Sequence, residues 1–395
     1  MKRLFLVLAV TLATLGCSAQ EPDWVTTWAT ALQIAEPHNR PPEPGLAGNS
    51  FRQILQVSVG GTELRLHLSN IFNTDATEIL GVEIAKATTM GAAPDIVEGT
   101  SVELTFGGER SFTMEAGGEA VSDPVPFALA DRDNLAVTIH YGSISAVTLT
   151  SHPGSRTSSY IALGNTIDFS SPAAVTAHWY TISSIDVKPL KPASAIAVLG
   201  DSITDGRGTT TNGQDRWTDQ LSRSLLKAGM NISVLNFGLG GNCILRGGLG
   251  PTGKSRYARD LFGHNGVEYI ILFEGTNDLG GSRDGLRTAS EIQEVWSQIV
   301  ADAHERGIKV FGATVTPVKG NGYYSEDHEA GRQQLNDWIR TGGVFDGVID
   351  FDKMVASAED PLRLDPAYLY ENDWLHLNAH GYEVMGHGID LSLFR

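Results

Sequence analysis

The feature that most constrains the fold of this chain is a change in hydrophobic pattern across residues 188–194. Upstream, in segments such as "LQVSVGGTELRLHLS", apolar and polar residues alternate, as they do in strands with one buried face. Downstream, continuous apolar runs alternate with helical stretches, which is typical of strands buried on both faces. With 395 residues, the chain is long enough to build both kinds of core.

We expect residues 20–187 to form an all-β accessory domain, a jelly-roll-like sandwich. Val57 and Val59 precede Gly60-Gly61 and alternating leucines follow, which predicts a hairpin. "SVELTFGGERSFTM" repeats this arrangement, so a second hairpin is predicted around Gly107-Gly108. The stretch "KPLKPAS", residues 188–194, is predicted to be a stiff linker because it carries two prolines and few apolar residues.

Residues 195–395 are predicted to form a three-layer α/β/α domain with a parallel sheet. Five apolar runs, "AIAVLG", "ISVLNFG", "EYIILFEG", "KVFGATVTPV" and "GVIDF", read as its strands. A helix is predicted over 288–306, opened by a capping box of Thr288 and Glu291 and stopped by Gly307. In such folds ligands bind beyond the carboxyl ends of the strands.

The N-terminus predicts export. Residues 1–19 have a basic start and an apolar run too short to span a bilayer, as in a signal peptide. "TLGC" resembles a bacterial lipoprotein processing site with Cys17 as the lipidated residue, and cleavage after Ala19 is the alternative. We therefore expect a periplasmic or cell-surface lipoprotein, with a membrane tether at Cys17, or a secreted protein. Cys243 then stands alone, so no disulfide is expected.

The net charge of −17 argues against a nucleic-acid partner and against electrostatic binding to anionic lipid. No CxxC or clustered His/Cys pattern suggests a metal, and we expect no cofactor.

Polar and glycine-rich motifs follow the predicted strands where a site should lie. Ser202 follows the first run in "GDSITDG", and the second run ends in "NFGLGGN", residues 236–242. The third run leads into "EGTND", which contains Asn277. Near the C-terminus, "DWLHLN" places Asp373 three residues before His376, and a helix is predicted from Ala379. Each motif alone is an ordinary turn, so their combination carries the prediction.

Together, "GDSITDG", "GLGGN", "GTND" and "DWLHLN" resemble, in order, the four blocks of the SGNH hydrolases, also called the GDSL esterase/lipase family. The resemblance covers residues 195 to about 390, with Ile203 where leucine is commoner. It implies an acyl-enzyme mechanism in which Ser202 attacks an ester. It also implies an oxyanion hole made by the Ser202 N–H, the Gly241 N–H, with Gly240 as the alternative, and the Asn277 amide.

The chemistry of the residue types agrees with this resemblance. A serine hydroxyl becomes a good nucleophile only when a base takes its proton, and His376 is the predicted base. Asp373 would orient the imidazole and stabilise its protonated form. An exported SGNH enzyme behind a β domain resembles bacterial carbohydrate acetylesterases, so the expected substrate is an acylated carbohydrate or another small ester. A lipase or lysophospholipase of the same family is the alternative, as is a non-enzymatic polysaccharide-binding lipoprotein.

Several other residues receive ordinary structural interpretations. Asp201 and Asp205 are predicted to cap the turn after Ser202, while His380 and His387 are predicted to lie on the surface of the last helix. Trp28 and Trp179 are predicted core residues, and Arg207 and Arg246 could reach the pocket mouth. "GLGPTGKS", residues 248–255, satisfies a phosphate-loop pattern, but it does not leave a strand directly, so we expect no nucleotide site.

Overall fold

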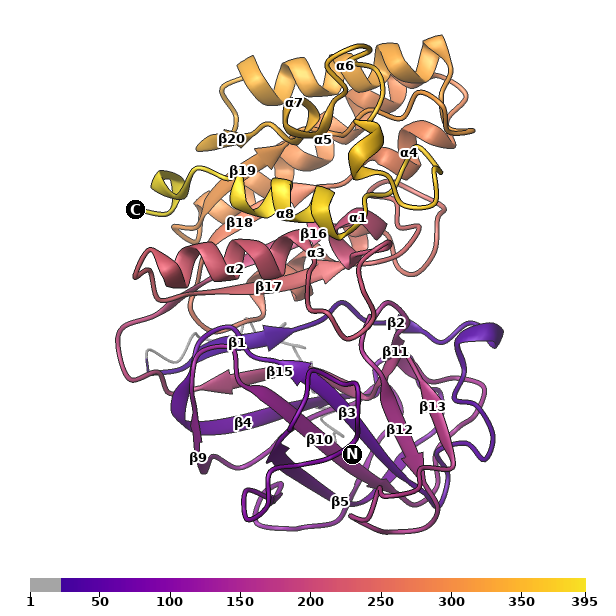
Figure 1. Cartoon of the computed structure of the whole chain (residues 1–395), viewed down its shortest axis with the longest axis vertical. Coiled ribbons are helices and arrows are strands. Elements are labelled where there is room, and N and C mark those ends of the chain that lie inside the picture. The colour runs from indigo at the N-terminus through magenta and orange to yellow at the C-terminus, as the bar shows by residue number, and fades with distance from the viewer. Residues whose placement is uncertain (1–22) are drawn as a thin grey trace, which may run out of the picture.

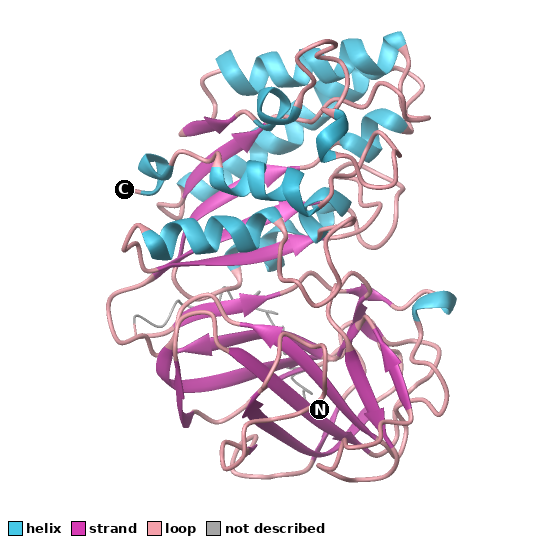
Figure 2. Ribbon diagram, in the orientation of Figure 1, coloured by secondary structure: helices cyan, strands magenta, loops and turns pink. Residues whose placement is uncertain are grey.

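The computed structural model of the protein describes residues 23–395, which form a β-rich half followed by an α/β half (Figure 1, Figure 2). The predicted signal peptide, residues 1–19 with Cys17, lies outside the described residues. Residues 188–193 join the two halves without regular secondary structure. Within residues 23–395, no helix combines the length and the apolar character needed to cross a membrane.

The described residues of the β half form three antiparallel sheets. The strand orders are β1-β15-β4-β8 with β9 beside β4, β13-β12-β3-β10-β5-β6 with β7 beside β5, and β14-β11-β2. The strands are β1 (Val25–Ala29), β2 (Gln33–Ile34), β3 (Ser50–Gln56), β4 (Gly61–Ser69), β5 (Thr77–Lys86), β6 (Val102–Leu104), β7 (Phe112–Met114), β8 (Glu119–Val121), β9 (Val125–Leu129), β10 (Asn134–Tyr141), β11 (Thr150–His152), β12 (Ser159–Ala162), β13 (Ala174–Thr176), β14 (Trp179–Tyr180) and β15 (Ile182–Val187). A short 3-10 helix, η1 (Pro37–Asn39), follows β2.

Alternating apolar residues on the two larger sheets build one core. Every second residue of β4 is fully buried, and the inward residues of β10 in the other sheet belong to the same apolar cluster. These side chains are Leu64, Leu66 and Leu68 on β4 and Leu135, Val137 and Ile139 on β10. The period of two therefore gives the buried face correctly. The jelly-roll-like topology stays a prediction.

The predicted hairpin at Gly60-Gly61 is wrong, because β3 and β4 belong to different sheets. The chain between them crosses from one sheet to the other instead of turning back. Ser58 N donates to Thr27 O at 3.0 Å, which ties the crossing to β1. A Cβ on Gly60 would lie 2.2 Å from Leu129 O, so glycine is needed here for close packing rather than for a two-residue turn.

The hairpin predicted around Gly107-Gly108 is confirmed at its turn only. Phe106 and Glu109 exchange backbone hydrogen bonds of 2.8 and 3.3 Å across it, and both glycines have positive φ. The flanking strands β6 and β7 each pair with β5 rather than with each other, so the hairpin stops at this one bridge.

The α/β half has a five-stranded parallel sheet in the order β17-β16-β18-β19-β20, with helices on both faces (Figure 2). The strands are β16 (Ser194–Gly200), β17 (Ile232–Gly238), β18 (Val267–Phe273), β19 (Lys309–Ala313) and β20 (Gly347–Ile349). The helices are α1 (Ser202–Asp205), α2 (Trp217–Lys227), α3 (Gly253–Phe262), α4 (Thr276–Gly280), α5 (Gly285–His304), α6 (Glu326–Thr341), α7 (Phe351–Val355), α8 (Ala379–His387), η2 (Pro366–Tyr368) and η3 (Leu391–Phe394).

Burial on both faces explains the continuous apolar runs. Ala197 and Leu199 of β16 belong to the cluster that contains residues of α3, α5 and α6. Ile196 and Val198, on the opposite face, belong to the cluster that contains residues of α2, α7 and α8. The sheet is thus the middle of three layers.

Helix α5 begins earlier than its predicted start at Thr288. Asp284 is the N-cap and accepts a hydrogen bond from Arg287 N at 3.0 Å, so Thr288 lies inside the helix and the predicted capping box is wrong. An upstream residue that is an equally good cap was available, and it extends the helix by almost one turn. The predicted helix from Ala379 is confirmed as α8, with Asn378 as its cap.

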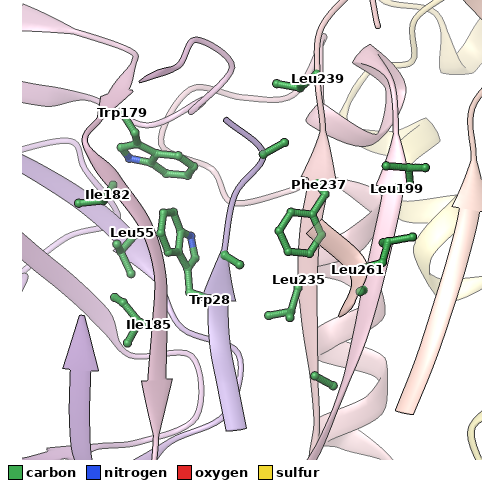
Figure 3. Packing of buried hydrophobic residues seen from close by; sticks show 14 of the residues in the cluster. Trp28, Leu55, Trp179, Ile182, Ile185, Leu199, Leu235, Phe237, Leu239 and Leu261 are labelled. Atoms are coloured by element: carbon green, nitrogen blue, oxygen red, sulfur yellow. The ribbon is translucent and has the colours of Figure 1, made fainter. Parts of the chain in front are cut away.

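Strand β1 carries the contact between the halves (Figure 3). Trp28 and Trp179 meet edge to face with ring centres 5.0 Å apart, and both are buried, as predicted. Across the boundary lie Leu235 and Phe237 of β17, in the same apolar cluster. Thr30 also forms a parallel bridge with Asn236. The two halves therefore share a hydrophobic core and are not joined by the connecting segment alone.

Candidate active site

Ser202 stands at the start of α1, directly beyond the carboxyl end of β16, which lies between β17 and β18 in the sheet. Asp201 caps this four-residue helix by accepting from Ile203 N at 3.0 Å, and Gly206 ends it with φ at 89°. A Cβ on Gly200 would lie 2.2 Å from Thr204 Oγ1 and 2.9 Å from Phe273 O, so only glycine lets the strand meet the helix this closely. The tight turn presents the hydroxyl at the sheet edge.

The structure brings Ser202, His376 and Asp373 into one line of hydrogen bonds. Ser202 Oγ lies 2.8 Å from His376 Nε2, and His376 Nδ1 lies 2.6 Å from Asp373 Oδ2. A carboxylate can only accept, so Nδ1 carries the proton and Nε2 accepts from the serine hydroxyl. His376 is buried, with 8% of its surface exposed.

Local hydrogen bonds hold Asp373 in place. Its Oδ1 accepts from the backbone N–H groups of Leu375 at 2.9 Å and of His376 at 2.8 Å. Partial burial raises the pKa of Asp373, but the hydrogen bonds from the His376 ring and these two N–H groups outweigh it and hold the pKa below its usual value. Asp373 is therefore ionised and faces the imidazole as an anion.

Asn277, in the first turn of α4, lies at the same pocket with its amide orientation fixed. Its Nδ2 donates to Asn242 O at 2.8 Å, and its Oδ1 accepts from the Tyr323 hydroxyl at 3.1 Å. The second N–H of this amide remains for a ligand. Sequence reasoning did not identify Tyr323, because a tyrosine on the loop after β19 carries no signal of its own.

Both candidate glycines line the pocket with Ser202. Among residues 23–395, neither the Gly240 N–H nor the Gly241 N–H finds an acceptor. Gly241 has φ at 67°, a conformation that glycine adopts without strain. Ser202 N–H is the first of α1 and has no partner within the helix. Free donors from three chain segments thus converge near one hydroxyl.

The pocket around Ser202 has a volume of about 450 Å³, and most of the residues that line it have polar or charged side chains. One of its walls comes from the β half, through the β2–η1 segment, the loop after β11 and His178. This contribution was not predicted, since the sequence of the β half does not show which loops face the other half. The aliphatic side chains in the lining are those of Pro153, Leu249 and Leu375.

The capping prediction holds for Asp201 and is wrong for Asp205. Asp205 Oδ1 lies 3.0 Å from His152 Nε2, and Oδ2 accepts from Arg156 Nη2 at 3.1 Å. Burial raises the pKa of Asp205, but the charges of Arg156, His152 and Arg216 outweigh it and hold the pKa below its usual value. Partners from a remote segment, rather than the local backbone, thus satisfy this carboxylate.

The arginines and outer histidines have different positions. Arg207 is exposed and lines the pocket, as predicted for its mouth, with its guanidinium 5.8 Å from the centre of the Tyr370 ring. Arg246 lies in an adjoining pocket, where it pairs with Glu291. His380 and His387 are exposed on α8 near Glu383, which confirms that they are surface residues.

Buried acidic groups lie beneath the site. Burial raises the pKa of Asp278 to about 6 although it accepts from the N–H groups of Ile244 and Leu245. Burial also raises the pKa of Glu274 to about 8 and that of the Cys243 thiol to about 12. Cys243 is thus buried and uncharged at neutral pH, which disfavours it as a nucleophile.

No group of histidine, cysteine or acidic residues within residues 23–395 is arranged to hold a metal ion. The phosphate-loop pattern also lacks its structural context. Strand β17 ends at Gly238, whereas α3 begins at Gly253, and Lys254 is exposed. A phosphate loop joins its strand and helix directly, so this stretch is an ordinary loop and helix start.

Residues 198–384 match the GDSL-like lipase/acylhydrolase family. No curated protein matches the chain. Among solved structures, a carbohydrate acetylesterase family member from Sinorhizobium meliloti is 18% identical, covering 49% of this chain and 94% of its own, with a TM-score of 0.39. A lipase/acylhydrolase from Enterococcus faecalis is 19% identical, with coverage of 51% and 93% and a TM-score of 0.39. An aryl esterase from M. smegmatis is 19% identical, with coverage of 49% and 95% and a TM-score of 0.39.

The matched region contains Ser202, Asn277, Asp373 and His376. Through it, this part of the chain belongs to the GDSL-like lipase/acylhydrolase family, the SGNH hydrolases.

Proposed function

We propose that the protein is a serine esterase that removes short acyl groups, above all acetyl groups, from carbohydrates. The observation that carries the esterase part is the continuous hydrogen-bond line from Ser202 through His376 to Asp373. Nucleophile, base and orienting carboxylate stand in the order that nucleophilic ester hydrolysis requires.

In the proposed reaction, Ser202 Oγ attacks the ester carbonyl carbon while His376 Nε2 takes the hydroxyl proton. The imidazolium that forms is stabilised by Asp373. The tetrahedral intermediate collapses, the bond to the alcohol oxygen breaks, and His376 returns the proton to that oxygen. Water then attacks the acyl-serine by the same steps in reverse, releasing the carboxylic acid and the free hydroxyl of Ser202.

We assign the oxyanion hole to the Ser202 N–H, the Gly241 N–H and the Asn277 side-chain amide, with Gly240 as the alternative glycine. Support comes from their free donors and from their place in the lining of one pocket. Donors that are already oriented stabilise developing negative charge without reorganisation, which is commonly the largest electrostatic contribution to such reactions.

The many polar side chains in the lining favour a short acyl group on a polar alcohol. A long acyl chain would need an extended apolar channel to leave water, and the aliphatic side chains that line this pocket are those of Pro153, Leu249 and Leu375. Hydroxyl-rich alcohols, in contrast, find donors and acceptors on several sides. The lipase or lysophospholipase alternative therefore has less support than the carbohydrate esterase.

The test is hydrolysis of 4-nitrophenyl esters of increasing chain length together with acetate release from acetylated glycans. We expect the highest kcat/KM on the acetyl ester, release of acetate from a glycan, and no activity in Ser202→Ala. A preference for long acyl chains would favour the lipase alternative. No hydrolysis by the unaltered protein would favour a polysaccharide-binding protein.

We also propose that the chain is exported and lipidated at Cys17, with residues 20–187 as an accessory domain before the catalytic domain 195–395. The mass of the mature protein purified from a bacterial host tests the first point. A diacylglyceryl adduct on a chain beginning at Cys17 supports lipidation, whereas a chain beginning at Gln20 without an adduct supports secretion.

A further inference from the structure

The β half supplies one wall of the pocket that contains Ser202. Glu36 lies between β2 and η1, and Asn39 is the last residue of η1. Arg156 comes from the loop after β11, and His178 directly precedes β14. In Figure 1, β2 and β11 lie on the side of the β half that faces α1. A substrate bound to Ser202 in this pocket therefore lies beside side chains of both halves.

Glu36 presents a fixed carboxylate to this pocket. One oxygen accepts from Gln33 Nε2 at 2.6 Å and the other from Asn39 Nδ2 at 2.9 Å. Each oxygen keeps a further lone pair, and among residues 23–395 no cation forms an ion pair with Glu36. A carboxylate held in this way can accept hydrogen bonds from two adjacent hydroxyl groups.

His178 adds a second acceptor to the same wall. Its Nδ1 lies 2.6 Å from Pro153 O and therefore carries the proton. Burial lowers the pKa of His178, which keeps the ring neutral at pH 7 and leaves Nε2 as a lone-pair acceptor. Two acceptors on one wall need a ligand that donates hydrogen bonds. Hydroxyl groups do so, whereas an acyl chain, a phosphate diester and a carboxylate do not.

The wall is held at a fixed distance from the nucleophile. Asp205, in the same short helix as Ser202, binds His152 and Arg156 on the two sides of Pro153-Gly154. A Cβ on Gly154 would lie 2.0 Å from Asp205 Oδ2, so the loop touches the carboxylate directly. A rigid wall of this kind can select a ligand without first becoming ordered.

We propose that Glu36 and His178 form a subsite for a neutral polyhydroxyl ring, and that it holds the sugar of the ester beside Ser202. This inference rests on the proposed function, because it assigns the place of the alcohol in that reaction. It predicts that the β half determines the choice of alcohol but contributes little to the chemistry of the acyl group.

The experiment compares two esters in the full chain. One is 4-nitrophenyl acetate, whose alcohol part has no free hydroxyl group to donate to the subsite, and the other is a mono-O-acetylated methyl glycoside. The variants are Glu36→Gln and His178→Asn, with Glu98→Gln, on an exposed turn of the β half, as the matched control. Thermal melting of each variant checks that the fold is intact.

We expect Glu36→Gln to raise KM for the acetylated glycoside by roughly tenfold or more, as loss of a hydrogen bond to a charged group does. His178→Asn should act in the same direction, and in both variants kcat/KM should fall much less for 4-nitrophenyl acetate than for the glycoside. An unchanged KM for the glycoside in both variants would overturn the subsite while leaving the esterase intact. Failure of the unaltered protein to cleave the glycoside, with 4-nitrophenyl acetate still cleaved, would also overturn it. Cleavage of neither ester would overturn the proposed function and the subsite with it.

Discussion

His152 Nε2 lies 3.0 Å from Asp205 Oδ1, and this contact ties the β half to the helix that begins at Ser202. The other ring nitrogen of His152, Nδ1, lies 2.9 Å from Ala31 O. Both ring nitrogens therefore lie within hydrogen-bond distance of an oxygen. With Arg156 on the second carboxylate oxygen, Asp205 is a buried anion held by two basic side chains of the β half.

Asp205→Asn is expected to destabilise the protein strongly. The amide keeps the shape but leaves His152 and Arg156 with a neutral neighbour, and breaking a buried ion pair commonly costs about 3–5 kcal/mol. Denaturant unfolding measures the loss. Asp337→Asn is the control, since Asp337 is 75% exposed and 3.8 Å from Arg340, and the change should cost no more than about 1 kcal/mol. Equal stabilities of the two variants would contradict this interpretation of the contact.

The sequence predicts the chemistry of the site better than its surroundings. Ser202, Asn277 and the Asp373–His376 pair each lie in a short motif at the end of an apolar run. In a parallel sheet the carboxyl ends of the strands meet at one edge, so position along the chain implies proximity. Asp373 and His376 are also close enough in sequence for local geometry to pair them.

The features of the site that depend on contacts between the two halves could not be predicted from the sequence. Asp205 was predicted to be a cap because only its neighbours in sequence were considered, and its real partners are in the β half. Nothing in the sequence around Glu36 indicates that it lines the same pocket as Ser202. Alternation showed which side of β4 is buried, but strand pairing depends on the whole sheet, so the hairpin at Gly60-Gly61 was wrong.

Asn277→Ala should fold normally and hydrolyse esters poorly. The amide donates to Asn242 O and offers its remaining N–H to the pocket, so its loss removes an oxyanion donor. Loss of one such donor commonly lowers kcat by about 10²–10³. Steady-state kinetics with 4-nitrophenyl acetate measure kcat, and a thermal melt checks that the variant is folded. Normal turnover would exclude Asn277 from the oxyanion hole.

Tyr323→Phe should lower kcat by about 5–30-fold with little change in KM. The hydroxyl donates to Asn277 Oδ1 at 3.1 Å and so keeps the amide nitrogen toward the pocket. This bond acts on a group that is needed in the transition state more than in substrate binding. Tyr324→Phe, next in the chain, is the control and should behave like the unaltered enzyme.

A double-mutant cycle separates this positioning role from a general effect on the fold. If Tyr323 acts only through Asn277, adding Tyr323→Phe to Asn277→Ala should lower kcat no further. If kcat of the double variant instead falls by the product of the two single-variant factors, Tyr323 acts on the substrate or on the fold.

Glu274→Gln should make stability less dependent on pH. Glu274 is fully buried beneath the site, neither carboxylate oxygen has a hydrogen-bond partner among residues 23–395, and the nearest cation is Arg256 Nη2 at 3.9 Å. Burial is the main cause of its raised pKa of about 8, against 4.5 for the free side chain, and the nearby Asp278 and Asp201 add to it. Between pH 4.5 and about pH 8, the Glu274 carboxyl group therefore keeps its proton in the folded protein and loses it in the unfolded chain.

This difference in protonation between the folded and unfolded states determines how the free energy of unfolding changes with pH. Below pH 4.5 both states are protonated and the full stability is present, whereas from there to about pH 8 the free energy of unfolding falls, by at most about 1.4 kcal/mol per pH unit. Glutamine does not titrate, so Glu274→Gln should melt higher relative to the unaltered protein at pH 8 than at pH 5. Glu268→Gln, exposed on the same strand β18, is the control and should show no such change. If the difference in melting temperature between Glu274→Gln and the unaltered protein is the same at pH 5 and pH 8, Glu274 is already ionised in the folded protein. Arg256 would then stabilise the carboxylate more than its distance of 3.9 Å implies.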